Sequence, residues 1–72
     1  MYEELKTKFG YVDGQIGVTL DDEYVIVSID NECATVQTLQ ENGWMRVNVY
    51  YPDGTEEEYY RKWKSIRLNY AL

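Results

Sequence analysis

Short apolar segments with a period of two alternate with turn signals along most of this chain. Ile16, Val18 and Leu20 occupy alternate positions, and residues 34–39 and 66–72 repeat the pattern. Such alternation indicates β-strands with one buried face, and tight turns about every ten residues favour a small all-β meander. The sequence therefore predicts a mostly β fold of about five to six antiparallel strands over residues 15–72.

Residues 24–29 differ from the other strand candidates because nearly every position is apolar. A continuous apolar run is typical of a strand that is covered on both faces. We therefore expect these residues to form the central strand of the sheet. Acidic turns at residues 21–22 and 30–32 bound this strand, since acidic and amide side chains favour tight turns.

Residues 1–9 have helical periodicity instead. Tyr2, Leu5 and Phe9 form a single apolar stripe, as expected for one face of a short helix. Gly10 can end this helix in the left-handed conformation. A helix of about two turns is unstable alone, so we expect its stripe to pack against the sheet.

An Asn-Gly pair at residues 42–43 predicts the first hairpin. Both central residues of a type I′ turn have positive φ, and Asn-Gly tolerates that conformation best. A two-residue loop there pairs Val36 with Val49 and Thr38 with Val47, so apolar residues meet on one face.

A Pro-Asp-Gly sequence at residues 52–54 predicts the second hairpin. Proline presets φ for a turn, and glycine supplies a left-handed residue. A three-residue loop pairs Val47 with Tyr59 and Arg46 with Tyr60.

This layout resembles the small barrels of SH3-like and Tudor-like proteins in architecture, although no family motif accompanies it. The resemblance implies a strongly bent sheet or a barrel, with residues 66–72 as a last strand or an extended tail that closes the sheet. A chain of 72 residues is the size of one domain. We therefore expect residues 1–72 to form a single domain.

The composition argues against catalysis. The chain has no histidine, which is the commonest general base near neutral pH and the commonest zinc ligand. It also lacks a glycine-rich phosphate loop, a nucleophile elbow and zinc-ligand spacing. We therefore predict a protein that is not an enzyme, with no catalytic residue, metal or cofactor.

Nothing in the sequence indicates a membrane or secretory destination. Its apolar stretches are too short for a bilayer-spanning helix, and residues 1–5 lack the apolar core of a signal peptide. The single cysteine, Cys33, cannot form an internal disulfide. We expect a cytoplasmic protein, located in the host cytoplasm if it is viral, that is a monomer or a homodimer.

The charge of the chain is uneven. Residues 1–58 carry all 13 acidic residues, residues 59–72 carry none, and the net charge is −6. An acidic body attracts basic partners and repels phosphate backbones; the alternative is that the acidic residues are only solvated. The candidates for partner contact are Glu56, Glu57, Glu58, Asp53, Asp21 and Asp22.

Aromatic residues gather in and beside the second hairpin. Successive strand residues point to opposite faces, so we assign Tyr51 and Tyr59 to the core. Trp44, Tyr50 and Tyr60 then lie on an outer face with Arg46, Glu56 and Glu58. Aromatic rings attract cations and are frequent in interface hot spots. An outer face of rings and carboxylates would suit a basic partner, unless the closing barrel or the helix covers the rings.

A basic strip with one aromatic ring follows the acidic run. This composition is typical of a strand that contacts phosphates and stacks on a base. The acidic body opposes phosphate binding, so we place nucleic-acid binding second. The strip consists of Arg61, Lys62, Trp63, Lys64 and Arg67.

We predict a small acidic protein-binding module that engages a basic protein surface. A sharper form of this hypothesis is an inhibitor that mimics nucleic acid and blocks a nucleic-acid-handling enzyme. In size and charge the chain is similar to small phage-encoded inhibitors of restriction or CRISPR enzymes. The alternatives are a small-barrel nucleic-acid-binding protein that uses the basic strip, and a structural subunit of a larger assembly.

Overall fold

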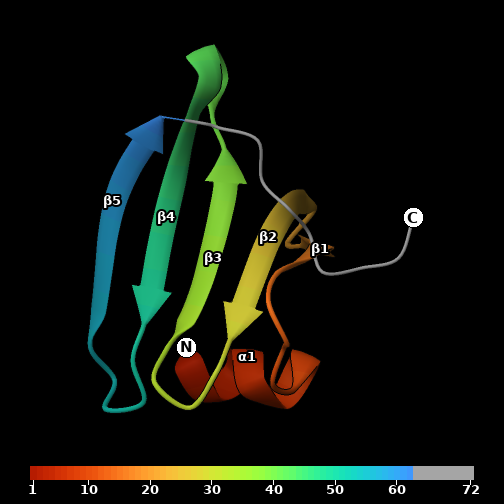
Figure 1. Ribbon diagram of the computed structural model, residues 1–72, viewed down its shortest axis with the longest axis vertical. Coiled ribbons are helices and arrows are strands. Elements are labelled where there is room, and N and C mark those ends of the chain that lie inside the picture. The colour runs from red at the N-terminus through yellow and green to blue at the C-terminus, as the bar shows by residue number, and fades with distance from the viewer. Residues whose placement is uncertain (63–72) are drawn as a thin grey trace.

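Five antiparallel strands form one sheet in the order of the sequence (Figure 1). The structure is a computed structural model that describes residues 1–62. The fold is mostly β with one short N-terminal helix, and the expected strand at 66–72 lies outside the described residues. The elements are α1 (Tyr2–Phe9), β1 (Ile16–Leu20), β2 (Glu23–Ile29), β3 (Ala34–Leu39), the 3₁₀ turn η1 (Glu41–Gly43), β4 (Trp44–Tyr50) and β5 (Glu56–Lys62).

The sheet is open over the part of the chain that the structure describes. β1 and β5 are its two edges, and they do not pair with each other there. The five described strands agree with the predicted antiparallel meander. In residues 1–62, no helix is long and apolar enough to cross a membrane.

α1 packs on one face of the sheet through the stripe that the sequence predicts. Tyr2 and Leu5 are buried in one cluster with residues of β2 and β3. The Tyr2 hydroxyl donates to the backbone oxygen of Asp30 at 2.6 Å, which ties the helix to the β2–β3 turn. Gly10 ends the helix with φ of 73°, a conformation that glycine adopts readily. The predicted helix is confirmed.

The core lies between α1 and the first three strands. Val27, Ile29 and Ala34 are all 0% exposed. The β2–β3 register pairs Val27 with Val36 and Ile29 with Ala34, so these side chains stand side by side beneath the helix. Full burial of each large apolar side chain contributes about 1.5–3 kcal/mol.

β3, rather than β2, is buried on both faces. Val36, Gln37 and Thr38 are consecutive in β3 and all buried, whereas Ile26 and Ser28 of β2 are half-buried. β3 also occupies the middle position of the five strands. The prediction of β2 as the central strand is wrong, because β3 holds the middle position and the second face of β2, at Ile26 and Ser28, is only half-buried.

The β3–β4 turn is one residue longer than predicted. Its Asn-Gly pair has the expected positive φ values of 64° and 78°. However, Glu41 joins the pair in η1, and the Gln40 N–H closes the turn by donating to the Trp44 oxygen at 2.6 Å. Val36 consequently faces Asn48 rather than a valine. The predicted register is therefore wrong by one residue, which turns one strand to the opposite face.

The β4–β5 hairpin has the predicted register, with Arg46 opposite Tyr60. In its turn the Tyr51 N–H donates to the Thr55 oxygen at 2.9 Å. The Asp53 carboxylate accepts from the Thr55 N–H at 2.9 Å and from its hydroxyl at 2.6 Å. The three-residue loop predicted at residues 52–54 is confirmed.

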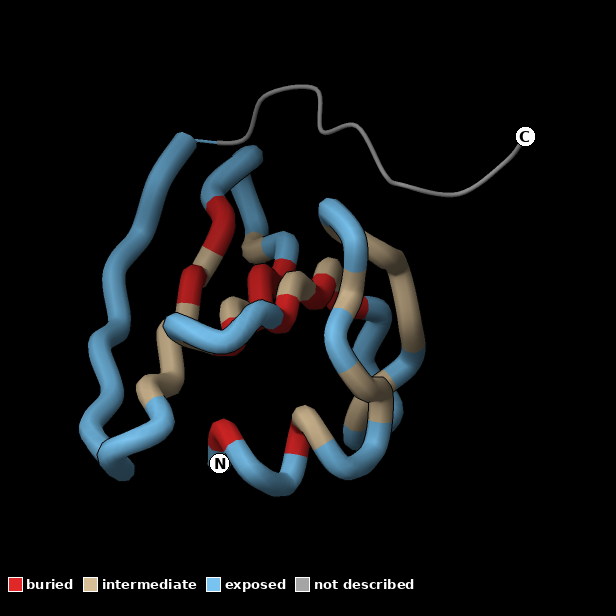
Figure 2. The backbone as a smooth tube through the Cα atoms, turned by 60° about the horizontal axis from the view of Figure 1, so that its bottom comes forward, coloured by how far each residue is buried: buried red, intermediate tan, exposed pale blue. Residues whose placement is uncertain are grey.

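The sheet has two unlike faces. We call the face that packs against α1 the helix face and the opposite one the far face. Figure 2 shows the sheet curving around the helix face, with β5 and β1 at its two sides. On the far face Met45 and Val47 are 1% exposed, although no helix or strand of residues 1–62 lies over them. Large exposed side chains surround them: Tyr24, Leu39 and Tyr59.

Candidate binding face

α1 covers only part of the helix face. The core cluster under α1 contains residues of β2 and β3 with flanking residues of β1, and only Tyr50 joins it from β4 and β5. Every residue of β5 is exposed, and Tyr60 and Trp44 are 55% and 44% exposed. The helix face therefore continues, uncovered by α1, over the β4–β5 hairpin.

Carboxylates flank this uncovered region on two sides. On β5, Glu56 lies opposite Tyr50 and Glu58 lies opposite Asn48. Across the face, the β1–β2 turn and the first residue of β2 bring two further carboxylates to a pocket beside α1. We call this surface the acidic face; it consists of Asp21, Glu23, Glu56 and Glu58, with Arg46, Tyr50 and Tyr60 between them.

The glutamates of β5 lack basic partners in the described structure. Within residues 1–62 the ion pairs join Glu4 to the N-terminus, Glu3 to Lys6 and Glu23 to Arg46. Glu58 accepts only from the Asn48 amide, at 3.0 Å. Their negative charge is thus available to a partner.

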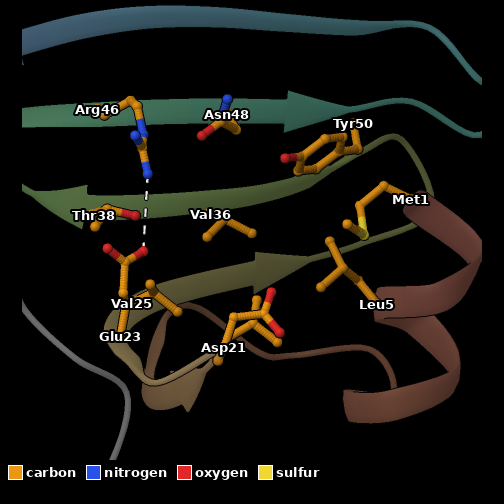
Figure 3. A pocket seen from close by; sticks show the side chains of 11 residues that line it. Met1, Leu5, Asp21, Glu23, Val25, Val36, Thr38, Arg46, Asn48 and Tyr50 are labelled. Carbon is orange, nitrogen blue, oxygen red and sulfur yellow. Dashed lines mark ion pairs between the residues drawn. The ribbon is translucent and has the colours of Figure 1, made fainter.

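The pocket lies between α1, the β1–β2 turn and strands β2 to β4, with a volume of about 130 Å³. At one end Arg46 and Glu23 reach toward each other across Thr38 (Figure 3). At the other end Met1 and Leu5 of α1 lie against the sheet. The pocket therefore combines a polar end with an apolar end.

Arg46 is the basic residue at the centre of the acidic face, and Lys62 lies on the same side of the sheet at the end of β5. The Arg46 guanidinium lies 3.9 Å from the Glu23 carboxylate, at the long limit of an ion pair. Its Nε is buried without a hydrogen-bond partner. A long and partly exposed pair contributes about 0–1 kcal/mol. Arg46 therefore neutralises its carboxylate surroundings only in part.

The electrostatics of the face affect the Tyr50 hydroxyl. Burial raises the pKa of Tyr50 above its ordinary value, and Glu56 and Glu58 raise it further, while Arg46 acts in the opposite direction. The negative charge of β5 therefore extends over the neighbouring strand.

The structure brings most of the sequence-predicted partner residues to one face. Trp44, Tyr50, Tyr60, Glu56 and Glu58 follow the same alternation on β4 and β5, as predicted. The prediction that this was the face away from the core is wrong, because Tyr50 packs against the core cluster under α1. The one-residue shift in the β3–β4 register is the cause.

The assignment of Tyr51 and Tyr59 to the core is also wrong. Tyr59 is exposed, and Tyr51 is half-buried. The Tyr51 hydroxyl donates to Glu57 at 2.7 Å, and this bond raises the pKa of Tyr51. Glu57 thus lies on the far face, apart from Glu56 and Glu58.

The remaining acidic candidates lie in turns. Asp21 lines the pocket, whereas Asp22 is exposed beside it and is not among the residues that line it. The Asp53 carboxylate holds its own turn through Thr55, and these hydrogen bonds lower the pKa of Asp53. Of these three, Asp21 alone joins the acidic face.

The alternative basic strip is described only in part. Arg61 pairs with Met45 and Lys62 with Trp44, so the two basic side chains point to opposite faces of β5. Trp63, Lys64 and Arg67 lie outside the described residues.

The sequence interpretation placed Arg46 with the rings and glutamates of this face, but it did not name Glu23 or Asn48 as contact residues. The signal for the side of the sheet was present in the turn: with Glu41 counted in the loop, Arg46 falls opposite Thr38, on the helix side of the sheet. Within residues 1–62, no three acidic or cysteine side chains are grouped as a metal site.

Comparison with family models, curated proteins and solved structures finds no match.

Proposed function

We propose that the protein is a binding module that holds a basic segment of a partner protein on its acidic face. The main support is β5, which is exposed along its length and carries glutamates without a described ion-pair partner. Separated charges of one sign on an exposed face attract an oppositely charged partner and orient it.

The rings of this face support the same proposal. Tyr60 lies opposite Arg46 of β4. Along β5 it follows Glu56 and Glu58, toward the open end of the hairpin. Exposed aromatic rings contribute cation–π attraction of about 0.5–1 kcal/mol to a bound Lys or Arg. Tyrosine also supplies large contact area at low entropic cost. A basic segment would therefore find both charge and contact area here.

Binding of a fluorescein-labelled peptide of alternating lysine and threonine tests the proposal. We expect affinity that falls steeply with salt, and about a tenfold loss in the double variant Glu56→Gln with Glu58→Gln, or about 1.4 kcal/mol. The matched control is Glu57→Gln, on the same strand but on the far face, where glutamine still offers an acceptor to Tyr51. Equal losses in the variant and the control would contradict the proposal.

A sharper form of the proposal is an inhibitor that occupies the nucleic-acid groove of a basic enzyme. The open acidic face supports it only through its charge and its exposure. Competition is the test: duplex DNA should displace the protein from such an enzyme, and the protein should displace the DNA.

The edge strand supports one alternative, a structural subunit of a larger assembly. β5 pairs only with β4 in the described chain, and an open edge offers unpaired backbone groups to another chain. Sedimentation across a range of concentrations distinguishes self-association from a stable monomer.

The nucleic-acid alternative depends on a strip that is described only in part, and Lys62→Glu in a gel shift with single-stranded RNA tests it.

The finer fold assignment, an SH3-like or Tudor-like barrel, also remains a proposal. The sequential antiparallel strands are compatible with it. Closure would require further pairing at β1 or β5.

A further inference from the structure

The pocket beside α1 differs from the rest of the acidic face because buried apolar side chains line it together with carboxylates. Leu5, Val25 and Val36 are buried residues that form its apolar lining. The carboxylates of Asp21 and Glu23 belong to the same lining. A ligand that matches this lining has a long alkyl chain, which contacts the apolar residues, and a charged head, which meets the carboxylates.

The size of the pocket fits one side chain. Its volume of about 130 Å³ exceeds the roughly 10–15 Å³ that a cavity needs to hold one water molecule. A lysine or arginine side chain buries its methylene stem against apolar surface and keeps its charged head near polar groups.

The sign of the charge selects a cation. Asp21 has no ion-pair partner within the described residues, and Glu23 has only the long contact with Arg46. Glu56 and Glu58 add negative charge from β5, strongly enough to affect Tyr50. Arg46 offsets part of this charge. Met1, whose N-terminal ammonium pairs with Glu4, also lines the pocket, and Lys62 lies on the same side of β5. The carboxylates of Asp21, Glu23, Glu56 and Glu58 still outnumber these cations.

We propose that this pocket receives the side chain of a single lysine or arginine from the partner. The stem lies against Leu5 and Val36, and the head meets the carboxylate of Asp21, with that of Glu23 beside it. This inference rests on the proposed function, because it names the part of a basic segment that fixes the segment's position on the acidic face.

Two neighbouring aspartates provide a matched test. Asp21 and Asp22 occupy the same turn with φ values of 52° and 66°, but only Asp21 lines the pocket. Asparagine tolerates the left-handed conformation well, so Asp21→Asn and Asp22→Asn should both fold, and each removes one negative charge. We expect Asp21→Asn to weaken binding of the lysine–threonine peptide about fivefold, and Asp22→Asn less than about twofold.

Changes in the peptide identify the side chain. Replacing one lysine at a time by norleucine keeps the stem and removes the charge. One position should lose much more affinity than the others in the wild-type protein, and this difference should disappear in Asp21→Asn. A second peptide carries arginine at that position. Its affinity, compared with that of the lysine peptide, shows which of the two side chains the pocket prefers.

Two outcomes would overturn the inference: equal effects of the two aspartate variants, or full affinity for norleucine at every position. In either case a loss of affinity in the Glu56 and Glu58 double variant would leave the proposed function standing. If no variant changes binding, or if the peptide does not bind, the proposed function fails as well.

Discussion

The β2–β3 pair and the β4–β5 hairpin are both antiparallel pairs with alternating patterns, yet the structure uses them differently. Val27 and Ile29 of β2 are 0% exposed beneath α1, whereas every residue of β5 is exposed. β2 and β3 therefore stabilise the fold beneath α1, whereas β5 buries no side chain of its own and the buried residues of the hairpin, Met45 and Val47, belong to β4. Side chains that do not stabilise a fold are available for another purpose, and here they are acidic and aromatic.

The largest expected effect is a difference in stability between these regions. Ile29→Ala removes a fully buried side chain and should lower the free energy of unfolding by about 2–5 kcal/mol. Tyr60→Ala removes an exposed side chain from β5 and should change it by no more than about 0.5 kcal/mol. Urea denaturation measures both. Similar losses in the two variants would show that β5 belongs to the core.

A smaller effect is expected where α1 is tied to the β2–β3 turn. Tyr2→Phe removes the hydrogen bond from the hydroxyl to the Asp30 oxygen and should cost about 0.5–1.5 kcal/mol. The control is Tyr24→Phe, since Tyr24 is exposed on the far face. If the two variants unfold at the same urea concentration, this bond does not hold the helix.

Acid should weaken one turn in each region. The Cys33 and Glu32 N–H groups lower the pKa of Asp30, and Thr55 lowers that of Asp53. A pKa that is lowered on folding gives stability that is complete above the unfolded value, about 3.9, and is lost as the pH falls through the native value. Asp30→Asn and Asp53→Asn should each flatten the loss of stability below about pH 4. A profile as steep as that of the wild type would contradict these roles.

The smallest effect concerns the Tyr50 hydroxyl. Its pKa is raised by burial and by Glu56, so it should keep its proton to a higher pH than a free tyrosine. Glu56→Gln should move that pKa back toward the ordinary value, and Glu57→Gln should not. NMR titration of the Tyr50 ring measures both, and an unchanged pKa in Glu56→Gln would show that β5 does not affect this site.

The sequence contained enough information for the helix, for the meander and for the β4–β5 register. The apolar stripe of α1 and the Pro-Asp-Gly loop are local signals, and both elements form as predicted. The β3–β4 register was missed because an Asn-Gly pair has positive φ in loops of more than one length. In the structure, η1 and the closing bond between Gln40 and Trp44 show that Glu41 belongs to the turn.

The candidate site could be predicted only as a set of residue types. The alternation correctly grouped Tyr50, Tyr60, Glu56 and Glu58, since pairing across one hairpin is a local property. It could not show that α1 shares their face, because this depends on how a short helix packs against strands distant from it in sequence. The pocket follows from that packing and was missed.

The central claim is that a basic partner binds the helix face and not the far face. Methyl NMR spectra with the lysine–threonine peptide test it directly, because Leu20 and Val36 line the pocket while Val47 and Val49 alternate to the far face. We predict that the Leu20 and Val36 methyl signals shift as the peptide is added, and that those of Val47 and Val49 do not. Shifts confined to Val47 and Val49 would contradict the claim and place the partner on the far face.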